Sequence, residues 1–361
     1  MKKINRAVFM IPSFVAGGAE RVLIIIANEL AKRMVDTSII VFDMESYFYE
    51  IDKRIRLIRL NMPEIKVGGY GKYFRMPGNV RGVSSIIRRI NPDVVISFSY
   101  ITNIIAVLAC KRINTKVVIS ERTDPVRYNK LQRIFMSLLY RRADGFVYQT
   151  NAIQRKYAEK YKIRNSVVIY NPITKEQIGV SNKKEKVILS VGRLIPEKNH
   201  ELLIRAFASA EKLSDYELHI YGAGPLKEKL LDLIRQLDME KRIRLCGVEL
   251  NPIKIHNNAT IFALSSYVEG FPNALIEAMA NGILCVASDL ESGVIREIIQ
   301  NEENGYLFIN RDVNDLQNKL EKAAVQSEEN CRIIERAKKV YDTMNVDCIV
   351  DEWITYMEKV I

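Results

Sequence analysis

The feature that most constrains the fold of this chain is the alternation of short β-rich runs with helical patterns along nearly its whole length. Segments between the runs, such as residues 19–34, place apolar residues at helical spacing. Strands that alternate with helices favour parallel sheets covered by helices on both faces. The sequence therefore predicts an α/β fold with strands within residues 6–13, 37–43, 93–99, 115–120, 145–150, 166–171, 186–192, 217–222, 242–247, 259–265, 283–288 and 305–309.

The order of these runs also predicts two domains, because they fall into two sets on either side of a polar segment at residues 171–187. A chain of 361 residues exceeds what one hydrophobic core usually supports. We expect two doubly wound, Rossmann-like domains at residues 1–172 and 173–344. A final helical segment at residues 345–361 carries the only tryptophan, Trp353.

Hydropathy and cysteine usage exclude several classes of protein. The longest apolar runs, such as residues 22–27, are far shorter than the roughly 20 residues that span a bilayer. The N-terminal apolar run is typical of a first strand rather than of a signal peptide. Five cysteines without a C-x-x-C pair favour free thiols in a reducing compartment. We therefore expect neither export nor a membrane span.

Charge is divided unevenly between the two halves. Residues 1–172 hold 30 Lys and Arg against 13 Asp and Glu, whereas the remainder holds 24 against 30. A lobe this basic is attracted to a polyanion, either nucleic acid or an anionic membrane face. Basic residues mix with apolar ones at residues 71–90 and 127–142.

The second of these segments predicts an amphipathic helix. One face is apolar, and its basic residues lie largely elsewhere. The alternative for either segment is an ordinary core-facing helix with a solvated basic face. Two such segments in one basic lobe favour contact with a membrane surface. The apolar face of the second segment consists of Leu131, Ile134, Phe135, Leu138 and Leu139.

Glycines follow two of the predicted strands. Gly17 and Gly18 open the first helix, and Gly222 and Gly224 make a tight strand-to-helix turn. Glycine lets the backbone approach a phosphate closely, and a helix N-terminus offers N–H groups and partial positive charge. Each pair alone is also compatible with a simple turn, and the G-x-G-x-x-G fingerprint of nicotinamide enzymes is absent here.

Two cations follow the first strand of the second half. Arg193 comes directly after the strand and Lys198 lies at the entry to a helix. A planar guanidinium and a mobile ammonium suit a diphosphate that is held without a metal. The alternative is that both are solvated surface charges.

The stretch "YVEGFPNALIEAMANG", residues 267–282, places two carboxylates around a helix N-terminus. Pro272 suits the first helical turn, so Glu269 precedes the helix and Glu277 lies inside it. Free N–H groups are expected between them, at Asn273 to Leu275. Carboxylates accept hydrogen bonds from vicinal hydroxyls and helix N–H groups hold phosphate. This order matches the sugar, diphosphate and ribose of a nucleotide sugar, although an acid that favours the helix dipole is the alternative.

At these residues the chain resembles glycosyltransferase family 4, whose members are retaining transferases of the GT-B fold. The matching pieces are "GGAER" at 17–21, "VGRLIPEKNHELLIRAF" at 191–207, "IYGAGPLKEKL" at 220–230 and "EGFPNALIEAMANG" at 269–282. The resemblance implies two domains that face each other across a cleft, with the acceptor on the first and the donor on the second. It also implies that the last helix crosses back to the first domain.

The resemblance further implies roles for single residues. Arg193 and Lys198 would neutralise the donor diphosphate, Glu269 would contact the donor sugar and Glu277 the ribose. These two cations and Glu269 are the expected catalytic residues. The remaining expected donor-binding residues are Gly17, Gly18, Gly222, Gly224, Gly247, Gly270, Phe271, Pro272, Asn273, Ala274 and Leu275.

No D-x-D motif, which binds the metal in many other glycosyltransferases, occurs in the chain. We therefore expect metal-independent transfer, with no cofactor besides the nucleotide-sugar substrate. Many relatives carry a histidine near the donor sugar in the first domain, but all three histidines here lie in the second half. Glu121 and Arg122 stand in that region, within "SERTDP", and are candidates for the acceptor side. A similar pattern in bacterial N-acetylhexosamine transferases indicates an amino-sugar donor and a polyprenyl diphosphate acceptor.

The resulting expectation is a retaining glycosyltransferase that uses a UDP-sugar and a lipid-linked glycan. It would act in the cytoplasm, peripherally on the inner face of the cell membrane, where the basic lobe meets anionic lipid. A GT-B sugar-nucleotide epimerase is the first alternative. A nucleic-acid-binding protein is a remote one, because no recognition module or aromatic platform is present in the sequence, so we expect no nucleic-acid partner.

Overall fold

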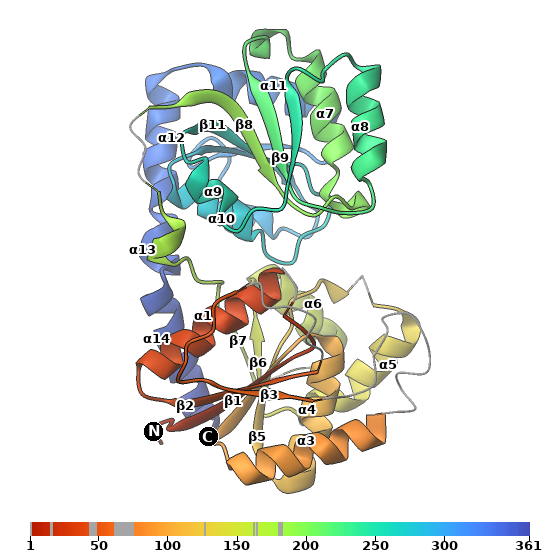
Figure 1. Cartoon of the computed structure of the whole chain (residues 1–361), viewed down its shortest axis with the longest axis vertical. Helices are drawn as coiled ribbons and strands as arrows, with labels where there is room; N and C mark the ends of the chain where they lie inside the picture. Colours follow the sequence, from red (N-terminus) through yellow and green to blue (C-terminus); the bar gives the residue numbers. More distant parts are fainter. Residues whose placement is uncertain are drawn as a thin grey trace. The chain divides into compact units, whose positions relative to one another are not determined.

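The computed structural model describes residues 2–14, 17–42, 49–60, 76–125, 128–161, 163, 165–179 and 183–361. The chain divides into two compact units (Figure 1). Unit 1 comprises Met1–Pro172 together with Val346–Ile361, and unit 2 comprises Ile173–Asn345. Each unit is built around its own parallel sheet.

The sheet of unit 1 has seven strands in the order β3-β2-β1-β4-β5-β6-β7. Every neighbouring pair is parallel, which requires a crossover between consecutive strands. The strands are β1 (Arg6–Ile11), β2 (Asp36–Val41), β3 (Arg56–Arg59), β4 (Val94–Phe98), β5 (Lys116–Ser120), β6 (Gly145–Tyr148) and β7 (Ser166–Val168).

The strand β3 was not predicted from the sequence. It is four residues long, begins and ends on arginine, and has no fully buried side chain. An edge strand of this kind lacks the continuous apolar run by which buried parallel strands are recognised.

Helices cover both faces of the unit 1 sheet (Figure 1). Alternate residues of the strands, with α1 and α14, form one core, while α3 and α4 pack together on the other side. The helices are α1 (Gly18–Lys32), α3 (Met76–Ile90), α4 (Tyr100–Ile113), α5 (Lys130–Leu139), α6 (Asn151–Tyr161) and α14 (Val346–Val360), with a 3₁₀ turn η2 (Tyr140–Arg142).

The C-terminal helix α14 belongs to the core of unit 1. Its Trp353 is fully buried, and the indole stacks on Phe98 at the end of β4, with ring centroids 6.0 Å apart. The hydroxyl of Tyr356 accepts the backbone N–H of Phe146 at 2.9 Å. The last helix is therefore part of the unit formed by the first 172 residues.

The sheet of unit 2 has six parallel strands in the order β10-β9-β8-β11-β12-β13, all of them predicted from the sequence. The strands are β8 (Glu185–Val191), β9 (Glu217–Tyr221), β10 (Ile243–Gly247), β11 (Ala259–Leu264), β12 (Leu284–Asp289) and β13 (Tyr306–Ile309). The α-helices are α7 (His200–Ser209), α8 (Lys227–Gln236), α9 (Pro252–Ile255), α10 (Asn273–Ala280), α11 (Val313–Ala324), α12 (Glu328–Lys338) and α13 (Val340–Met344). The 3₁₀ turns are η3 (Lys175–Gln177), η4 (Pro196–Lys198), η5 (Glu211–Leu213) and η6 (Ile295–Glu297).

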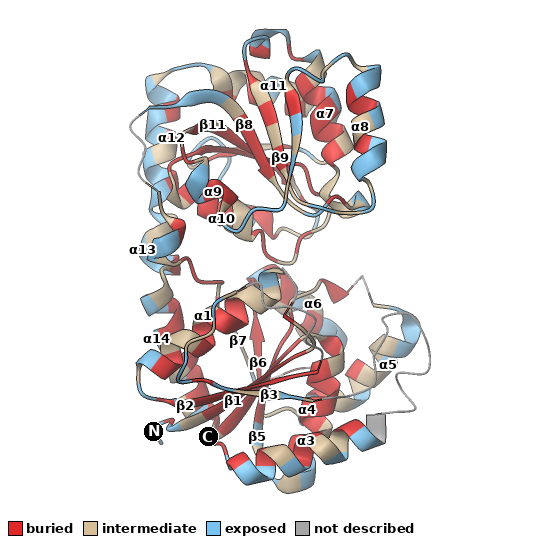
Figure 2. Cartoon of the chain, viewed as in Figure 1, coloured by how far each residue is buried: buried red, intermediate tan, exposed pale blue. Residues whose placement is uncertain are grey.

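Burial follows the layers (Figure 2). The central strands are buried on both faces, as β4 illustrates with five buried residues in succession. This explains why their sequences are apolar throughout and do not alternate with polar residues. The cysteines are free, and Cys110 and Cys285 are buried. Within the described residues, no helix combines the length and apolar character needed to cross a membrane.

Candidate active site

The strand order of unit 2 reverses between β8 and β11, which lie side by side. In open α/β sheets, ligands bind beyond the carboxyl ends of the strands at such a reversal. The loop after β8 carries Arg193 and Lys198, and the loop after β11 carries Glu269. The topology therefore brings these three predicted residues to one edge of one sheet.

Lys198 and Glu269 form an ion pair. The Nζ of Lys198 donates to Oε1 of Glu269 at 2.6 Å, and their side chains are 22% and 8% exposed. The Ser265 hydroxyl donates to the Lys198 carbonyl at 2.9 Å, and the Tyr267 N–H donates to the Glu197 carbonyl at 3.0 Å. These bonds tie the two loops together, so the cation and the carboxylate are held in place before any substrate binds.

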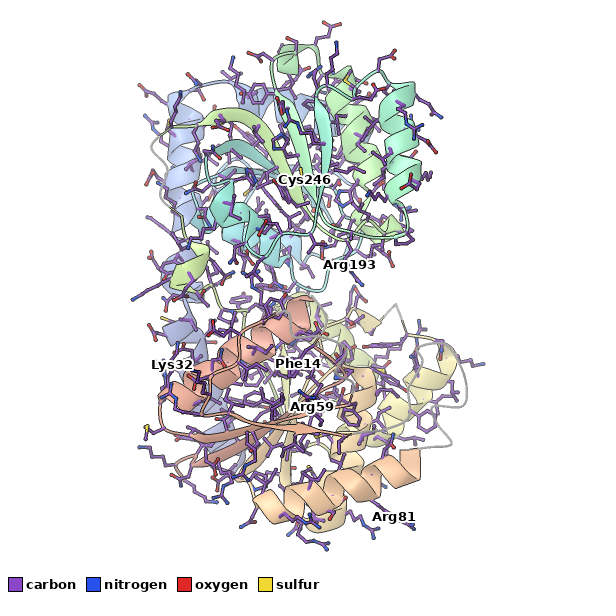
Figure 3. All side chains as sticks on the ribbon, in the orientation of Figure 1. Phe14, Lys32, Arg59, Arg81, Arg193 and Cys246 are labelled. Atoms are coloured by element: carbon purple, nitrogen blue, oxygen red, sulfur yellow. The ribbon has the colours of Figure 1, made fainter. Side chains whose placement is uncertain are left out.

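Arg193 is exposed at the same edge of unit 2 and is labelled in Figure 3. In the described part of the chain, no carboxylate pairs with its guanidinium. It differs in this respect from Lys198, whose charge is already partly balanced by Glu269. An exposed, unbalanced guanidinium beside a lysine is suited to bind an oxyanion.

The glycines after β9 allow close contact between neighbouring loops. Gly222 has φ +146°, and a Cβ there would lie 2.0 Å from the Gly192 carbonyl oxygen. A Cβ on Gly224 would lie 2.4 Å from the Leu194 carbonyl oxygen. The Gly222 N–H donates to the Gly247 carbonyl at 2.7 Å. The requirement for glycine at 222 and 224 thus comes from backbone packing, and a role in donor binding remains a prediction.

The N-terminus of α10 corrects one expectation. The N–H groups of Asn273 and Leu275 were expected to be free, but they donate to the carbonyls of Phe271 and Pro272 at 3.1 and 3.0 Å. Within the described residues, the N–H of Ala274, which lies between them, has no hydrogen-bond acceptor. The structure therefore leaves fewer free amides here than the sequence suggested. The reason is that Pro272 takes the N-cap position and its carbonyl closes the first turn.

The two acids of this motif are both buried. Glu269 and Glu277 are each 7% exposed, and Glu277 lies within α10 as predicted. Gly270 is half-buried, and Phe271 and Pro272 are buried between the two acids. Buried carboxylates are suited to accept hydrogen bonds from hydroxyls rather than to bind cations from solvent, and the binding of a ligand by these two acids stays a prediction.

His200 was not singled out from the sequence. It begins α7 two residues after Lys198 and is buried, and burial lowers the pKa of its imidazole to about 4. Its Nε2 donates to the Gly192 carbonyl at 3.3 Å, so the neutral ring supports the loop that carries Arg193. The signal available in the sequence was its position, directly between the phosphate-binding candidates and an apolar helix.

In unit 1 the strand order reverses between β1 and β4. Gly17 caps α1 with an extended backbone, φ −152°, and its carbonyl accepts the Tyr49 hydroxyl at 3.2 Å. Ser99, directly after β4, has φ +77° and ψ +146°. This conformation is nearly confined to glycine, so Ser99 marks a strained position at the reversal point.

Glu121, a candidate for the acceptor side, lies inside unit 1 directly after β5. Its carboxylate is fully buried and is bonded to side chains of four other segments. Burial raises the pKa of this carboxyl, while the hydrogen bonds lower it. The donors are Asn103 at 2.9 Å, Tyr128 at 2.9 Å, Tyr157 at 3.2 Å and Tyr140. Glu121 therefore fixes the loop after β5 from inside, and its place on the acceptor side stays a prediction.

Arg122 faces a different environment. Its guanidinium lies over the Phe98 ring, 4.2 Å from the centroid, and Nη1 donates to Asn171 at 2.5 Å. Nε and Nη2 are buried and donate to no group in the described chain. Burial lowers the pKa of Arg122 to about 9. It remains a candidate for the acceptor side, at the carboxyl edge of the sheet.

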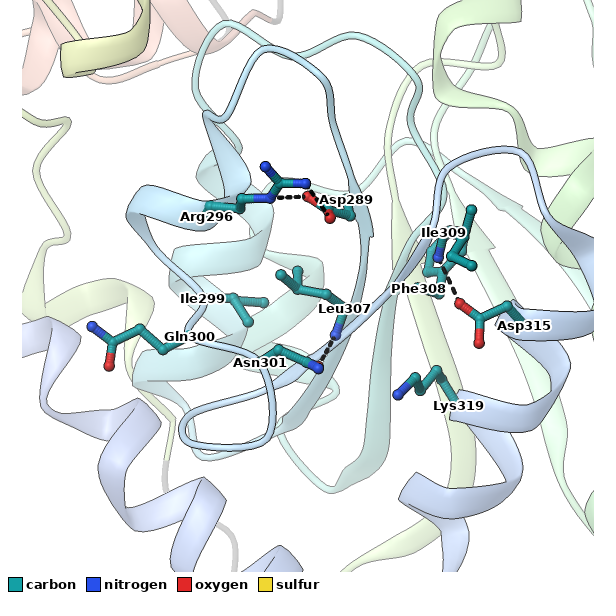
Figure 4. Close-up of a pocket in the computed structure, with 10 residues that line it drawn as sticks. All are labelled: Asp289, Arg296, Ile299, Gln300, Asn301, Leu307, Phe308, Ile309, Asp315 and Lys319. Carbon is teal, nitrogen blue, oxygen red and sulfur yellow. Dashed lines mark hydrogen bonds and ion pairs between the residues drawn. The ribbon is translucent and has the colours of Figure 1, made fainter.

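A cavity of about 610 Å³ lies elsewhere in unit 2, beside the edge strand β13 (Figure 4). The Asn301 side chain accepts the Leu307 N–H at 2.8 Å, and Asp315 accepts the Ile309 N–H at 2.6 Å. Asp289 pairs with Arg296 through two bonds of 2.6 Å. The polar side chains that line the cavity thus pair with one another or cover the edge strand β13. None of the predicted site residues lines this cavity.

Among the described residues, no group of three or more His, Cys, Asp or Glu side chains is arranged to hold a metal ion. Metal-independent transfer stays a prediction from the sequence.

Comparison with known proteins identifies the family. Residues 156–340 match the family described as Glycosyl transferases group 1, and residues 16–177 match Glycosyltransferase Family 4. An N-acetylgalactosaminyltransferase of Campylobacter jejuni, which acts on N-acetylgalactosamine-N,N'-diacetylbacillosaminyl-diphospho-undecaprenol, is 33% identical over 85% of this chain and 86% of its own. An uncharacterized glycosyltransferase of Haemophilus influenzae is 28% identical over 98% of this chain and 99% of its own.

Solved structures show the same fold. A Rickettsia africae glycosyltransferase has a TM-score of 0.84 at 20% identity, over 99% of this chain and 98% of its own. Anabaena HepE in complex with UDP has a TM-score of 0.82 at 18% identity, over 96% and 98%. The two parallel sheets and the family matches confirm the predicted GT-B fold and the resemblance. The chain belongs to the group 1 and family 4 glycosyl transferases, and it is a glycosyltransferase of the GT-B fold.

Proposed function

We propose that this enzyme moves an N-acetylhexosamine from a UDP-sugar to a glycan on a polyprenyl diphosphate, with retention of anomeric configuration and without a metal. The names of two relatives support the acceptor class, because both Campylobacter transferases are described as acting on glycans linked to undecaprenol through a diphosphate. Both are also named as N-acetylgalactosaminyltransferases, which supports an amino-sugar donor. The observation that carries the proposal is the grouping of Arg193, Lys198 and Glu269 at the strand-order reversal of unit 2.

The donor diphosphate would bind beside Arg193 and Lys198, with the free N–H of Ala274 as a further donor. Glu269, held by Lys198 at 2.6 Å, would accept hydrogen bonds from the donor sugar. Glu277 would accept them from the ribose diol. Breaking the bond from the anomeric carbon to the phosphate oxygen builds negative charge on the diphosphate. Cations fixed in advance stabilise this charge more in the transition state than in the ground state.

The proposed step exchanges one bond for another on the same face of the sugar. The electron pair of the broken carbon–oxygen bond leaves with the nucleoside diphosphate. The acceptor hydroxyl oxygen forms the new bond to the anomeric carbon, and its proton passes to the departing diphosphate oxygen. No external acid or base is required, because the leaving group itself takes the proton.

On the acceptor side, Arg122 would bind an oxygen of the acceptor. Two of its guanidinium nitrogens lack a protein acceptor, and leaving buried donors unpaired costs about 1–3 kcal/mol each. An oxygen of the acceptor would compensate for this cost. Glu121 would act as a positioning residue, since it anchors the peptide that carries Arg122. The basic first unit would keep the enzyme on the inner face of the cell membrane, where polyprenyl diphosphates are anchored.

Calorimetric titration of the full chain with nucleoside diphosphates and UDP-sugars, in EDTA, tests the donor class. We expect UDP and a UDP-N-acetylhexosamine to bind and added Mg²⁺ to leave the affinity unchanged. Binding that appears only with Mg²⁺ would contradict the metal-independent mechanism. Equal binding of other nucleotides would remove UDP as the preferred carrier.

Replacing Lys198 with alanine tests the site itself. We expect kcat/KM to fall by about 10²- to 10³-fold, because one preorganised cation at the leaving group is lost. Lys241→Ala, at an exposed position of the same unit, is the matched control and should leave turnover intact. Thermal unfolding of both variants separates loss of chemistry from loss of fold. Full turnover in Lys198→Ala would refute the assignment.

The epimerase alternative is not favoured, because the relatives with assigned activities in these comparisons are named mainly as sugar transferases. An epimerase would convert or release the donor sugar without an acceptor. Incubation with donor alone, followed by product analysis, therefore distinguishes the two activities.

A further inference from the structure

The helix α5 of unit 1 leaves three of its apolar side chains exposed. Leu131, Ile134 and Leu138 are 37%, 49% and 61% exposed, and only Met136 of this helix is buried. Residues three and seven positions apart lie on one face of an α-helix. The helix begins with a full capping box between Asn129 and Gln132, so its end is well formed.

The other basic segment behaves differently. In α3, the apolar residues Val83, Ile87 and Ile90 are buried, and Arg81, Arg88 and Arg89 are exposed. This helix packs on α4, so it is the core-facing helix with a solvated basic face that the sequence left as an alternative. Residues 71–75 and Arg127 lie outside the described residues. Of the two segments, α5 is the one that leaves Leu131, Ile134 and Leu138 exposed among the residues that the structure describes.

The segment that contains α5 is positively charged. Residues 127–142 contain five basic and no acidic residues. Lys130, Arg141 and Arg142 are exposed, and no carboxylate of the described chain pairs with them. We propose that α5 lies on an anionic lipid bilayer, with Leu131, Ile134 and Leu138 in the interfacial layer and these cations at the headgroups. The biological setting of this contact rests on the proposed function.

Charge and polarity together select this occupant. A second copy of the chain would bring the same cations face to face across an isologous contact, where they repel. A nucleic acid would pair with the cations but would leave the three apolar side chains without a favourable environment. An anionic bilayer offers both partners that the helix needs: an apolar layer for the three exposed side chains and negative headgroups for the cations.

The test measures binding of the full chain to sedimented vesicles of phosphatidylcholine, with and without phosphatidylglycerol. We expect binding to the anionic vesicles that weakens as salt is raised. The double variant Ile134→Ser, Leu138→Ser should lower the partition coefficient by about tenfold or more, because two apolar side chains no longer enter the interface. Both side chains are exposed, so the double variant should change the free energy of unfolding no more than ordinary surface substitutions do, about 0.5 kcal/mol each.

Met34 provides the matched control. It is 84% exposed, lies at the end of α1 in the same unit, and is remote in sequence from α5. Met34→Ser should bind vesicles as the parent chain does. Equal loss in both variants, or no loss in the double variant, would overturn the proposal. A concentration-dependent dimer that the double variant abolishes, without vesicle binding by the parent, would assign the face to a second copy.

Fluorescence locates the helix directly. The single tryptophan, Trp353, is fully buried, so its emission should not respond to vesicles. Leu138→Trp should add emission that shifts to shorter wavelength with anionic vesicles, whereas Met34→Trp should not shift. Vesicle binding requires neither donor nor acceptor, so failure of this proposal and failure of the proposed reaction are observed separately.

Discussion

At the scale of single residues, burial decides what a titratable side chain can do. Glu121 and Arg122 are neighbours in the sequence, yet one is bound by four protein donors and the other retains two unpaired ones. His200 is likewise explained by burial, because the ring supports the Gly192 carbonyl as a neutral donor. These assignments depend on the side chains that surround each group, which come from distant parts of the chain.

His200 gives a prediction for the pH dependence of stability. Its pKa is lowered to about 4 in the folded protein from an ordinary value of 6.5. Below pH 6.5 the unfolded chain binds a proton that the folded chain refuses, so the free energy of unfolding falls as pH drops from about 6.5 to 4. The full effect is about 3 kcal/mol, at 1.36 kcal/mol per pH unit.

Urea unfolding of the parent chain and of His200→Gln across this window measures the effect. Glutamine keeps a donor for the Gly192 carbonyl but does not titrate. The free energy of unfolding of the parent chain should therefore fall relative to that of His200→Gln as pH drops from about 6.5 to 4. A constant difference would mean that His200 is not buried as a neutral ring.

At the scale of elements, the donor site depends on loops that follow different strands and touch through their backbones. Gly222 follows β9 and contacts the loop that follows β8, while its N–H reaches the end of β10. A side chain at this position would push these loops apart and displace Arg193. The requirement is steric and conformational, and it concerns the shape of the site rather than its charge.

We predict that Gly222→Ala lowers the free energy of unfolding by about 3 kcal/mol or more, through a backbone clash at 2.0 Å and strain at φ +146°. Gly293→Ala combines φ +77° with open space and should cost about 1 kcal/mol. Gly78→Ala, in α3 with open space and no such strain, should be neutral or slightly stabilising. Calorimetry of the three variants ranks their stability, and UDP titration ranks their donor affinity. Parent-like stability of Gly222→Ala would contradict the contact with Gly192.

At the scale of the whole molecule, the C-terminal helix completes the unit formed by the first 172 residues. Trp353 stacks on Phe98, and the same phenylalanine lies under the guanidinium of Arg122. The last helix is thereby linked to the carboxyl edge of the unit 1 sheet through one ring. Unit 2 has a core of its own.

Replacing Trp353 with alanine should destabilise unit 1 by about 3–5 kcal/mol, because a large buried side chain leaves a cavity. Trp353→Phe should cost much less, since it retains an aromatic partner for Phe98 and removes an indole N–H that has no acceptor in the described chain. Calorimetry should show the unit 1 transition shifting while that of unit 2 stays in place. A joint shift of both transitions would indicate that the units unfold together.

The sequence by itself determined the order of elements, twelve of the thirteen strands in the described part of the chain, the motif residues and hence the family. These features are local, since periodicity and short motifs are read along a continuous segment. It missed β3, because a short edge strand with arginine at both ends carries no apolar run. Only the tertiary structure decided that Glu121 is enclosed and that Gly222 meets Gly192. It also decided that α3 buries Val83, Ile87 and Ile90, whereas α5 leaves Leu131, Ile134 and Leu138 exposed. The physical reason is that burial is a property of the segments that pack together. Two amphipathic stretches with similar patterns therefore differ in exposure when one packs its apolar face more completely than the other.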